Sequence, residues 1–157
     1  IKATGISCIF VTHDAQDAIS LAHKIAVLDQ GKVIQMGTPK VLFDQPFTPA
    51  IARFFGEINI FNQEDFQHFD IELEKADFYG IRPENITYSL TPVKNSYAAV
   101  IMGETFHGLW RKYRIKLSSQ IELDLMIDAQ VLIERKEIFI TLDPAHLLRF
   151  QKKNYSF

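Results

Sequence analysis

Hydrophobic positions near the start of the chain predict a strand followed by a helix. The apolar run Cys8–Val11 is typical of a short buried strand, and the polar residues from Thr12 to Asp14 end it. Apolar positions then recur at helical spacing, so a helix is predicted to begin near Asp14. These positions are Ala15, Ala18, Ile19 and Ala22. His13 is therefore predicted at the carboxyl end of a strand, where open α/β sheets bind ligands, although a turn histidine is also often just solvated or hydrogen-bonded.

The segment from residue 24 to residue 56 predicts a hairpin and two short helices. Two apolar stretches within residues 24–37 flank a glycine turn, which is the pattern of a hairpin. Threonine-proline pairs at 38–39 and 48–49 are typical of helix starts, with the threonine as cap and the proline at the first helical position. Gly56 is placed to end the second helix, and we predict a domain boundary just after it.

The second half of the chain has the alternating pattern of strands. Apolar residues alternate with polar ones over 121–127, as in a half-buried strand. An earlier strand is predicted to end at Pro83, which has no N–H group to donate. Residues 131–134 and 138–142 predict a hairpin, and a further strand is predicted over Leu147–Phe150. Short strands with turns at regular intervals favour a small antiparallel barrel.

Composition places the chain among ordinary globular proteins. It has 157 residues, of which 47% are hydrophobic and 23% charged. Its formal net charge of −2 provides no bulk attraction to nucleic acid or membrane. Cys8 has no second cysteine to pair with, which suits a reducing compartment, and its predicted burial makes it inert. No apolar run approaches the roughly 18–20 residues of a membrane span, so a membrane connection is expected only through a partner.

No metal site is predicted. The segment 57–77 is acidic and has Lys75 as its one lysine, but its acids alternate with apolar residues and lack the spacing of a calcium loop, so a solvated, partly strand-forming segment is expected. The histidines are too far apart in sequence for the spacing of zinc ligands. They are His13, His23, His68, His107 and His146.

A basic strand face is the strongest hint of nucleic-acid binding. Lys112, Arg114 and Lys116 are predicted on one face of a strand over Leu109–Leu117, near Trp110. Such a face can neutralise and stack a single strand, but cationic side chains on a strand are more often its solvated face. We therefore expect no nucleic-acid partner.

An ordered series of motifs in the first 56 residues resembles one family. It comprises Val-Thr-His-Asp at 11–14, a helix ending at 20–22, and Leu-Asp-x-Gly-Lys-Val-x-Gln-x-Gly-Thr-Pro at 28–39. The series is similar to the end of the nucleotide-binding domain of an importer-type ABC transporter ATPase. The resemblance implies that residues 1–56 are the remnant of an α/β P-loop ATPase domain. It makes His13 the catalytic, ATP-contacting switch histidine, which hydrogen-bonds the γ-phosphate and orients the attacking water.

A second motif resembles the regulatory domain appended to such ATPases. Gly80-Ile81-Arg82-Pro83-Glu84 is similar to the Gly-hydrophobic-Arg-Pro-Glu motif of the TOBE domain, an OB-like barrel. The resemblance implies an α+β chain in which residues 57–157 form this barrel, pair across a homodimer and, in some members, bind a regulatory ligand. Gly80, Arg82, Pro83 and Glu84 are its motif residues. A local ion pair between Arg82 and Glu84 that orders the turn is the commoner role for such a pair.

Motifs that the family requires for catalysis are missing from this sequence. It has no Gly-x-x-x-x-Gly-Lys-Ser/Thr loop, no Leu-Ser-Gly-Gly-Gln and no apolar strand ending in Asp-Glu before His13. We therefore expect a carboxyl-terminal fragment that by itself neither binds nor hydrolyses ATP and holds no cofactor. The resemblance implies that the parent subunit uses ATP and Mg²⁺, works with membrane permease subunits and lies in the cytoplasm on the inner face of the membrane.

Two other classes of function stay open on the sequence. The second half could be a stand-alone OB-like module that binds a small molecule or an oxyanion. It could also be a barrel that binds single-stranded nucleic acid, although the charge pattern argues against that. No residue pattern selects the transported substrate.

Overall fold

The computed structural model describes residues 7–151. The chain divides into two compact units between Pro46 and Phe47. No helix among the described residues is long and apolar enough to cross a membrane. The predicted boundary after Gly56 concerns family domains rather than compact units, and it stays a prediction.

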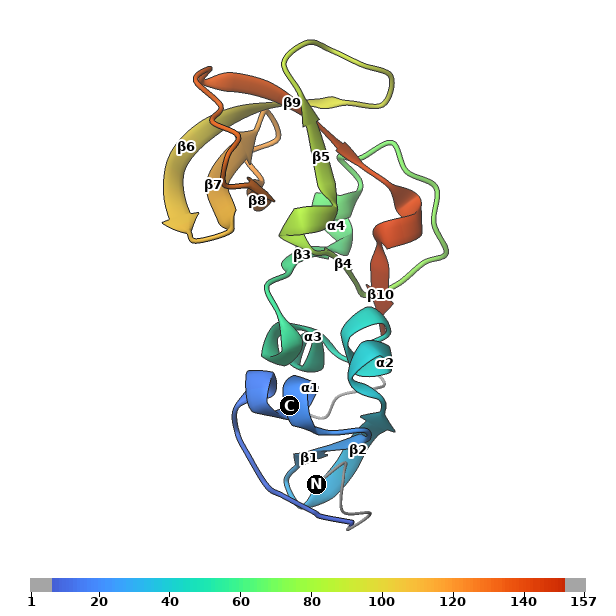
Figure 1. Ribbon diagram of the computed structural model, residues 1–157. Helices are drawn as coiled ribbons and strands as arrows, with labels where there is room; N and C mark the ends of the chain where they lie inside the picture. The colour runs from blue at the N-terminus through green and yellow to red at the C-terminus, as the bar shows by residue number, and fades with distance from the viewer. Residues whose placement is uncertain (1–6, 152–157) are drawn as a thin grey trace. The chain divides into compact units, whose positions relative to one another are not determined.

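The first unit contains a helix, a hairpin and a second helix (Figure 1). Asp14 caps the first helix at the predicted position, and the hairpin turns through Gln30 and Gly31 with φ of 46° and 76°, as a type I′ turn requires. Thr38 caps the second helix. The predicted helix starts and the hairpin are therefore confirmed. The elements are α1 (Ala15–Leu21), β1 (Ile25–Asp29), β2 (Lys32–Gly37) and α2 (Pro39–Asp44).

The predicted buried strand Cys8–Val11 is wrong. These residues adopt no strand, and the side chains of Ile9 and Val11 are 96% and 92% exposed. Cys8 is exposed as well, so its predicted burial is also wrong. A strand is held by hydrogen bonds to neighbours, and within the described part of the chain nothing pairs with this run.

The second unit combines two antiparallel sheets with short helical segments. The smaller sheet has three strands in the order β10-β4-β3, and the larger has five in the order β5-β9-β6-β7-β8. The elements are α3 (Pro49–Phe55), β3 (Asn59–Asn62), α4 (Gln63–Phe66), β4 (Phe78–Ile81), η1 (Pro83–Asn85), β5 (Ile86–Ser89), β6 (Tyr97–His107), β7 (Trp110–Leu117), β8 (Glu122–Asp128), β9 (Glu137–Leu142), η2 (Pro144–His146) and β10 (Leu148–Phe150).

The five-stranded sheet is open, because its outer strands β5 and β8 do not pair with each other. Its free edge at β8 is instead tied to the smaller sheet through one side chain. The Asn59 amide nitrogen donates to the carbonyl of Asp124 in β8 at 2.8 Å, and the amide N–H of Asp124 donates back to the Asn59 side chain at 2.8 Å. The mixture of helix and antiparallel strand is as predicted, whereas closure into a barrel is not confirmed.

The predicted hairpin over 131–134 and 138–142 is only half formed. β9 is present, but residues 131–134 adopt no strand, and β9 pairs with β5 and β6 instead. The backbone N–H of Ile133 donates to the hydroxyl of Tyr113 at 3.0 Å. This contact and the burial of the Ile133 side chain hold the segment against the core. The pattern of apolar and polar residues in 131–134 does not indicate this contact.

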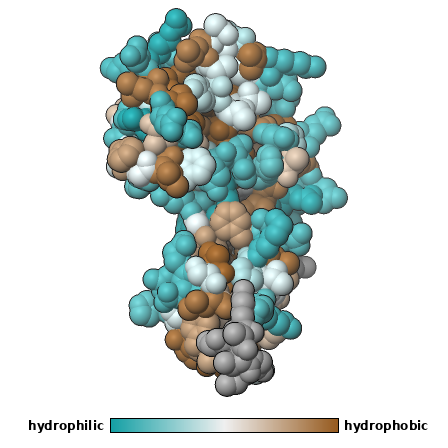
Figure 2. Space-filling model, in the orientation of Figure 1, coloured by the Kyte–Doolittle hydropathy of each residue, from teal (hydrophilic) through white to brown (hydrophobic). Residues whose placement is uncertain are grey.

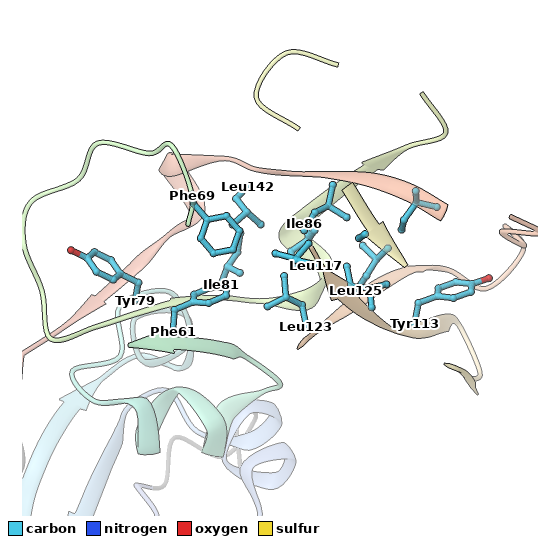
Figure 3. Packing of buried hydrophobic residues seen from close by; sticks show 14 of the residues in the cluster. Phe61, Phe69, Tyr79, Ile81, Ile86, Tyr113, Leu117, Leu123, Leu125 and Leu142 are labelled. Atoms are coloured by element: carbon cyan, nitrogen blue, oxygen red, sulfur yellow. The ribbon is translucent and has the colours of Figure 1, made fainter. Parts of the chain in front are cut away.

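The main hydrophobic core lies within the second unit, on the inner faces of its two sheets (Figure 3). Alternate residues of β7 point into it, namely Tyr113, Ile115 and Leu117, as predicted. At the other end of the core, Phe66 stacks on Tyr79 with ring centroids 3.9 Å apart. Aromatic residues of the acidic segment 57–77 thus become core, because α4 and the following loop fold back onto β4.

Candidate functional site

His13 lies in an exposed bend just before α1. The Asp14 carboxylate accepts hydrogen bonds from the N–H groups of Gln16 and Asp17, at 2.7 and 3.3 Å. The N–H of Asp14 in turn donates to the Thr12 hydroxyl at 3.0 Å. The backbone on either side of His13 is therefore fixed by short-range bonds, while the imidazole faces solvent and can meet an incoming ligand.

Gly80 lies where the smaller sheet is most tightly packed. A methyl group at this position would come within 2.8 Å of Ile58 Cδ1, 3.0 Å of Phe150 Cε2 and 3.1 Å of Ile60 Cδ1. Strands β3 and β10 flank β4 on its two sides, with Ile60 and Leu148 directly opposite Gly80. Glycine is required here for close approach of side chains, not for an unusual backbone angle.

Arg82 is buried, with 3% of its surface exposed. Its Nη1 donates to the carbonyl of Glu57 at 3.1 Å and to the carbonyl of Ala52 at 3.5 Å. Ala52 belongs to the last turn of α3, where carbonyl groups have no partner within the helix. A cation at this end is also favoured by the helix dipole. The guanidinium therefore supplies hydrogen-bond donors to carbonyl groups at the carboxyl end of α3.

The remaining two motif residues differ in their surroundings. Pro83 is fully buried and begins η1, whereas Glu84 is exposed. The structure thus buries Gly80, Arg82 and Pro83, with the Arg82 guanidinium at the end of α3, and leaves Glu84 in solvent. His13 belongs to the first unit and the motif to the second.

Two of the three basic side chains on the polar face of β7, those of Lys112 and Arg114, lie close to carboxylates. Lys112 Nζ lies 2.9 Å from the Glu57 carboxylate, and Arg114 Nε lies 3.6 Å from that of Asp124. Arg111 forms a further ion pair with Glu104. On the visible face of the second unit, hydrophilic residues surround separate hydrophobic patches (Figure 2). These carboxylates offset part of the positive charge of β7, and the absence of a nucleic-acid partner stays a prediction.

The second unit also has a shallow depression of about 440 Å³ on its five-stranded sheet. Ala98 and Val100 are among the residues that line it, and Lys116 and Glu137 contribute one charge of each sign. Among the residues that the structure describes, no group of three or more His, Cys, Asp and Glu side chains could hold a metal ion.

Comparison with known proteins places these motifs in one family. Over 153 residues the chain is 31% identical to the spermidine/putrescine import ATP-binding protein PotA of Fusobacterium nucleatum, a match that covers 80% of this chain and 41% of that protein. Over 116 residues it is 30% identical to the sulfate/thiosulfate import ATP-binding protein CysA of Nephroselmis olivacea, covering 74% and 31%. The chain belongs to the ATP-binding subunits of ABC importers.

The importer relatives are longer than this chain. Over 161 residues it is 28% identical to PotA of Borrelia garinii, covering 94% of this chain and 46% of that protein. The chain therefore spans less than half of the importer subunits it matches. No family model matches it.

Three residues that organise this importer-type chain carry no local signal in its sequence. Asn59 and Glu57 act through partners 65 and 55 residues away. Tyr113 is buried beneath Ile133, and this burial raises the pKa of its hydroxyl above the ordinary value, while the N–H bond from Ile133 acts in the opposite direction. Only the alternation of β7, which points Tyr113 inward, could have drawn attention to any of them.

Proposed function

We propose that this chain is the carboxyl-terminal part of the ATP-hydrolysing, energy-coupling subunit of an ABC importer. The observation that carries the proposal is similarity to import ATP-binding proteins over 74–94% of the chain, which includes both compact units. The relatives' names specify different substrates, spermidine or putrescine in one case and sulfate or thiosulfate in the other. We therefore assign no transported substrate.

In this proposal His13 is the switch histidine of the complete subunit. Its exposed side chain and the fixed backbone around it support a role in positioning, which dominates phosphoryl transfer. A neutral imidazole donates through one nitrogen and accepts through the other, so His13 would bond the γ-phosphate and help to orient water. The chain itself has no phosphate-binding glycine loop. Alone it would not hold Mg-ATP.

Exposed apolar residues support the view that the first unit is part of a larger ATPase domain. Patches of this kind mark surfaces that other protein covers. Large hydrophobic side chains are exposed in the segment before α1 and on all four elements of the unit, namely Ile9, Phe10, Val11, Leu21, Leu28, Val33, Met36 and Val41.

The part of the second unit that follows Gly56 would supply regulation and dimerisation. We propose that residues 57–157 form an OB-like TOBE domain after an ATPase portion at 1–56, and that two subunits pair as a homodimer. The antiparallel sheets joined through Asn59 support the OB-like assignment. The homodimer would drive membrane permease subunits from the cytoplasmic face of the membrane.

The test of the switch histidine uses the complete subunit with its permease. His13→Ala is expected to lower ATP turnover about 100-fold, the scale of a misplaced reacting group, with little change in ATP affinity. His23→Ala is the matched control, because His23 is exposed just after the same helix, and it should keep full turnover.

Near-normal turnover in His13→Ala would refute the assigned role. The 157-residue chain alone is expected to leave a fluorescent ATP analogue unbound, and binding in the micromolar range would contradict the missing phosphate cradle. A fluorescence titration and a phosphate-release assay decide these points.

A second candidate function is binding of a small molecule or oxyanion by the second unit. The observation that favours it is the depression beside Lys116 and Ser118. Trp110 is partly exposed at the opposite end of β7 from Lys116, so its fluorescence reports on changes that reach along this strand. Titration with molybdate, tungstate, sulfate and phosphate should alter its fluorescence if this function exists, and a flat response argues for a purely structural and dimerising unit.

A further inference from the structure

We propose that Gly80, Arg82 and Pro83 form a clasp that holds residues 49–60, here called the connector, rigidly against the sheets of the second unit. The connector consists of α3, the turn at Gly56 and the beginning of β3. The clasp gives the motif a mechanical role in place of ligand binding. This inference does not depend on the proposed function, because it uses only contacts within the second unit.

The first contact is the one that Arg82 makes with the end of α3. Its guanidinium bonds carbonyls on both sides of the helix end, at Ala52 and at Glu57. An arginine is suited to this position because its Nη1 carries two N–H groups that can serve both acceptors, and its positive charge lies at the negative end of the helix dipole. With only 3% of its surface exposed, Arg82 is shielded from a ligand arriving from solvent.

The second contact is steric and comes from Gly80. The side chains of Ile58 and Ile60 occupy the space that a Cβ atom at residue 80 would need. These two side chains follow α3 directly, so the missing Cβ lets the connector lie flat on β4. Pro83, fully buried, fixes the backbone where β4 ends and η1 begins.

Two further contacts fasten the connector to other strands. Glu57 pairs with Lys112 of β7 at 2.9 Å, and the Asn59 side chain bonds the backbone of Asp124 in β8 at 2.8 Å in both directions. The connector therefore contacts β4, β7 and β8 through residues 57–60. Any displacement of this side of the second unit carries the end of α3 with it.

Hydrogen–deuterium exchange of the 157-residue chain tests the clasp. Arg82→Ala removes both bonds to the connector, and loss of charged hydrogen bonds is expected to speed exchange of the connector amides roughly 10- to 100-fold. Amides in β6 and the β7–β8 pairs should be unchanged. Glu84→Ala is the matched control from the same motif, and it should leave all rates as they are because Glu84 is exposed.

Two results would overturn the clasp. One is an unchanged connector in Arg82→Ala, and the other is faster exchange spread evenly over the whole second unit, which indicates a general stabilising role. If Arg82→Ala does not fold, Arg82→Lys decides by the same criterion, because lysine keeps the charge but is shorter and lacks the planar guanidinium. Local acceleration limited to the connector supports the clasp.

Discussion

At the scale of single residues, a comparison of two glycines on neighbouring sheets distinguishes the effect of side-chain packing from that of backbone conformation. Side-chain atoms near Gly80 lie closer than van der Waals contact to the position of a missing methyl group, whereas nothing lies within 4 Å of the corresponding position at Gly103. Neither glycine has a positive φ. Any difference between alanine substitutions at the two sites therefore measures the space around them.

Gly80→Ala is expected to destabilise the second unit by about 1–3 kcal/mol, the usual cost of overpacking. Gly103→Ala is expected to be neutral or slightly stabilising, because alanine lowers the entropy of the unfolded chain without a clash. Urea denaturation of the two variants and the parent gives the three free energies of unfolding. Equal effects at both positions would show that Ile58 and Ile60 move aside at no cost.

Tyr113 connects burial to alkaline stability. Its raised pKa in the folded protein means that the unfolded chain ionises first as pH rises. Stability from this group is therefore complete below about pH 10, the ordinary tyrosine value, and falls above it until the folded pKa is passed. Tyr113→Phe removes the hydrogen bond from Ile133, and it also removes the dependence of stability on pH that ionisation of the Tyr113 hydroxyl causes. The stability advantage of the parent over the variant is expected to shrink between pH 8 and pH 11, and an advantage that grows would contradict the burial effect.

The positions of the important residues could be predicted from the sequence better than their contacts could. Asp14 could be predicted as a helix cap because the N–H groups that donate to its carboxylate are only two and three residues away. The Gly80–Glu84 motif could be located from its resemblance, and the local ion pair of Arg82 with Glu84 stays a prediction. The partners that the structure reveals for Arg82 are carbonyls 25 and 30 residues earlier, and only folding brings them together.

At the scale of helices and strands, the same distinction between local and distant bonds decides which predictions hold. The hydroxyl groups of Thr38 and Thr48 each accept a hydrogen bond from the N–H group three residues later. Because this bond is local, both helix starts can be predicted from the sequence. A strand needs a partner elsewhere in the chain. The predicted strands at Cys8–Val11 and at 131–134 fail for this reason, although both have suitable hydrophobic patterns.

Asn59 provides a test of how the two sheets of the second unit are joined. Asn59→Ala leaves the backbone N–H and carbonyl of Asp124 without their side-chain partner, so a loss of about 1–3 kcal/mol is expected, with faster amide exchange in β8. Asn62→Ala is the matched control, because Asn62 caps α4 and has no bond to β8. It should cost about 1 kcal/mol and leave β8 protected. Unchanged exchange in β8 of Asn59→Ala would mean that the sheets are held by their core alone.

At the scale of the whole molecule, the two units differ in how far they bury their apolar residues. The connected core from Phe61 to Leu142 lies in the second unit, while large apolar side chains remain exposed throughout the first. We expect the second unit to be the cooperative one in denaturation. The first unit, in our proposal, gains its remaining contacts from the rest of an importer ATPase.

The pairing of β10 with β4 determines when the second unit can finish folding during synthesis. Leu148 lies opposite Gly80, and Phe150 lies opposite Phe78. A growing chain leaves the ribosome from its amino end at roughly 5–20 residues per second, so β4 emerges several seconds before its partner. Throughout that interval one edge of β4 has no strand beside it, and the ring of Phe150 is not yet packed near Gly80. The sheet that holds the clasp is therefore among the last parts of the unit to form, long after the β6–β7 hairpin can close on its own.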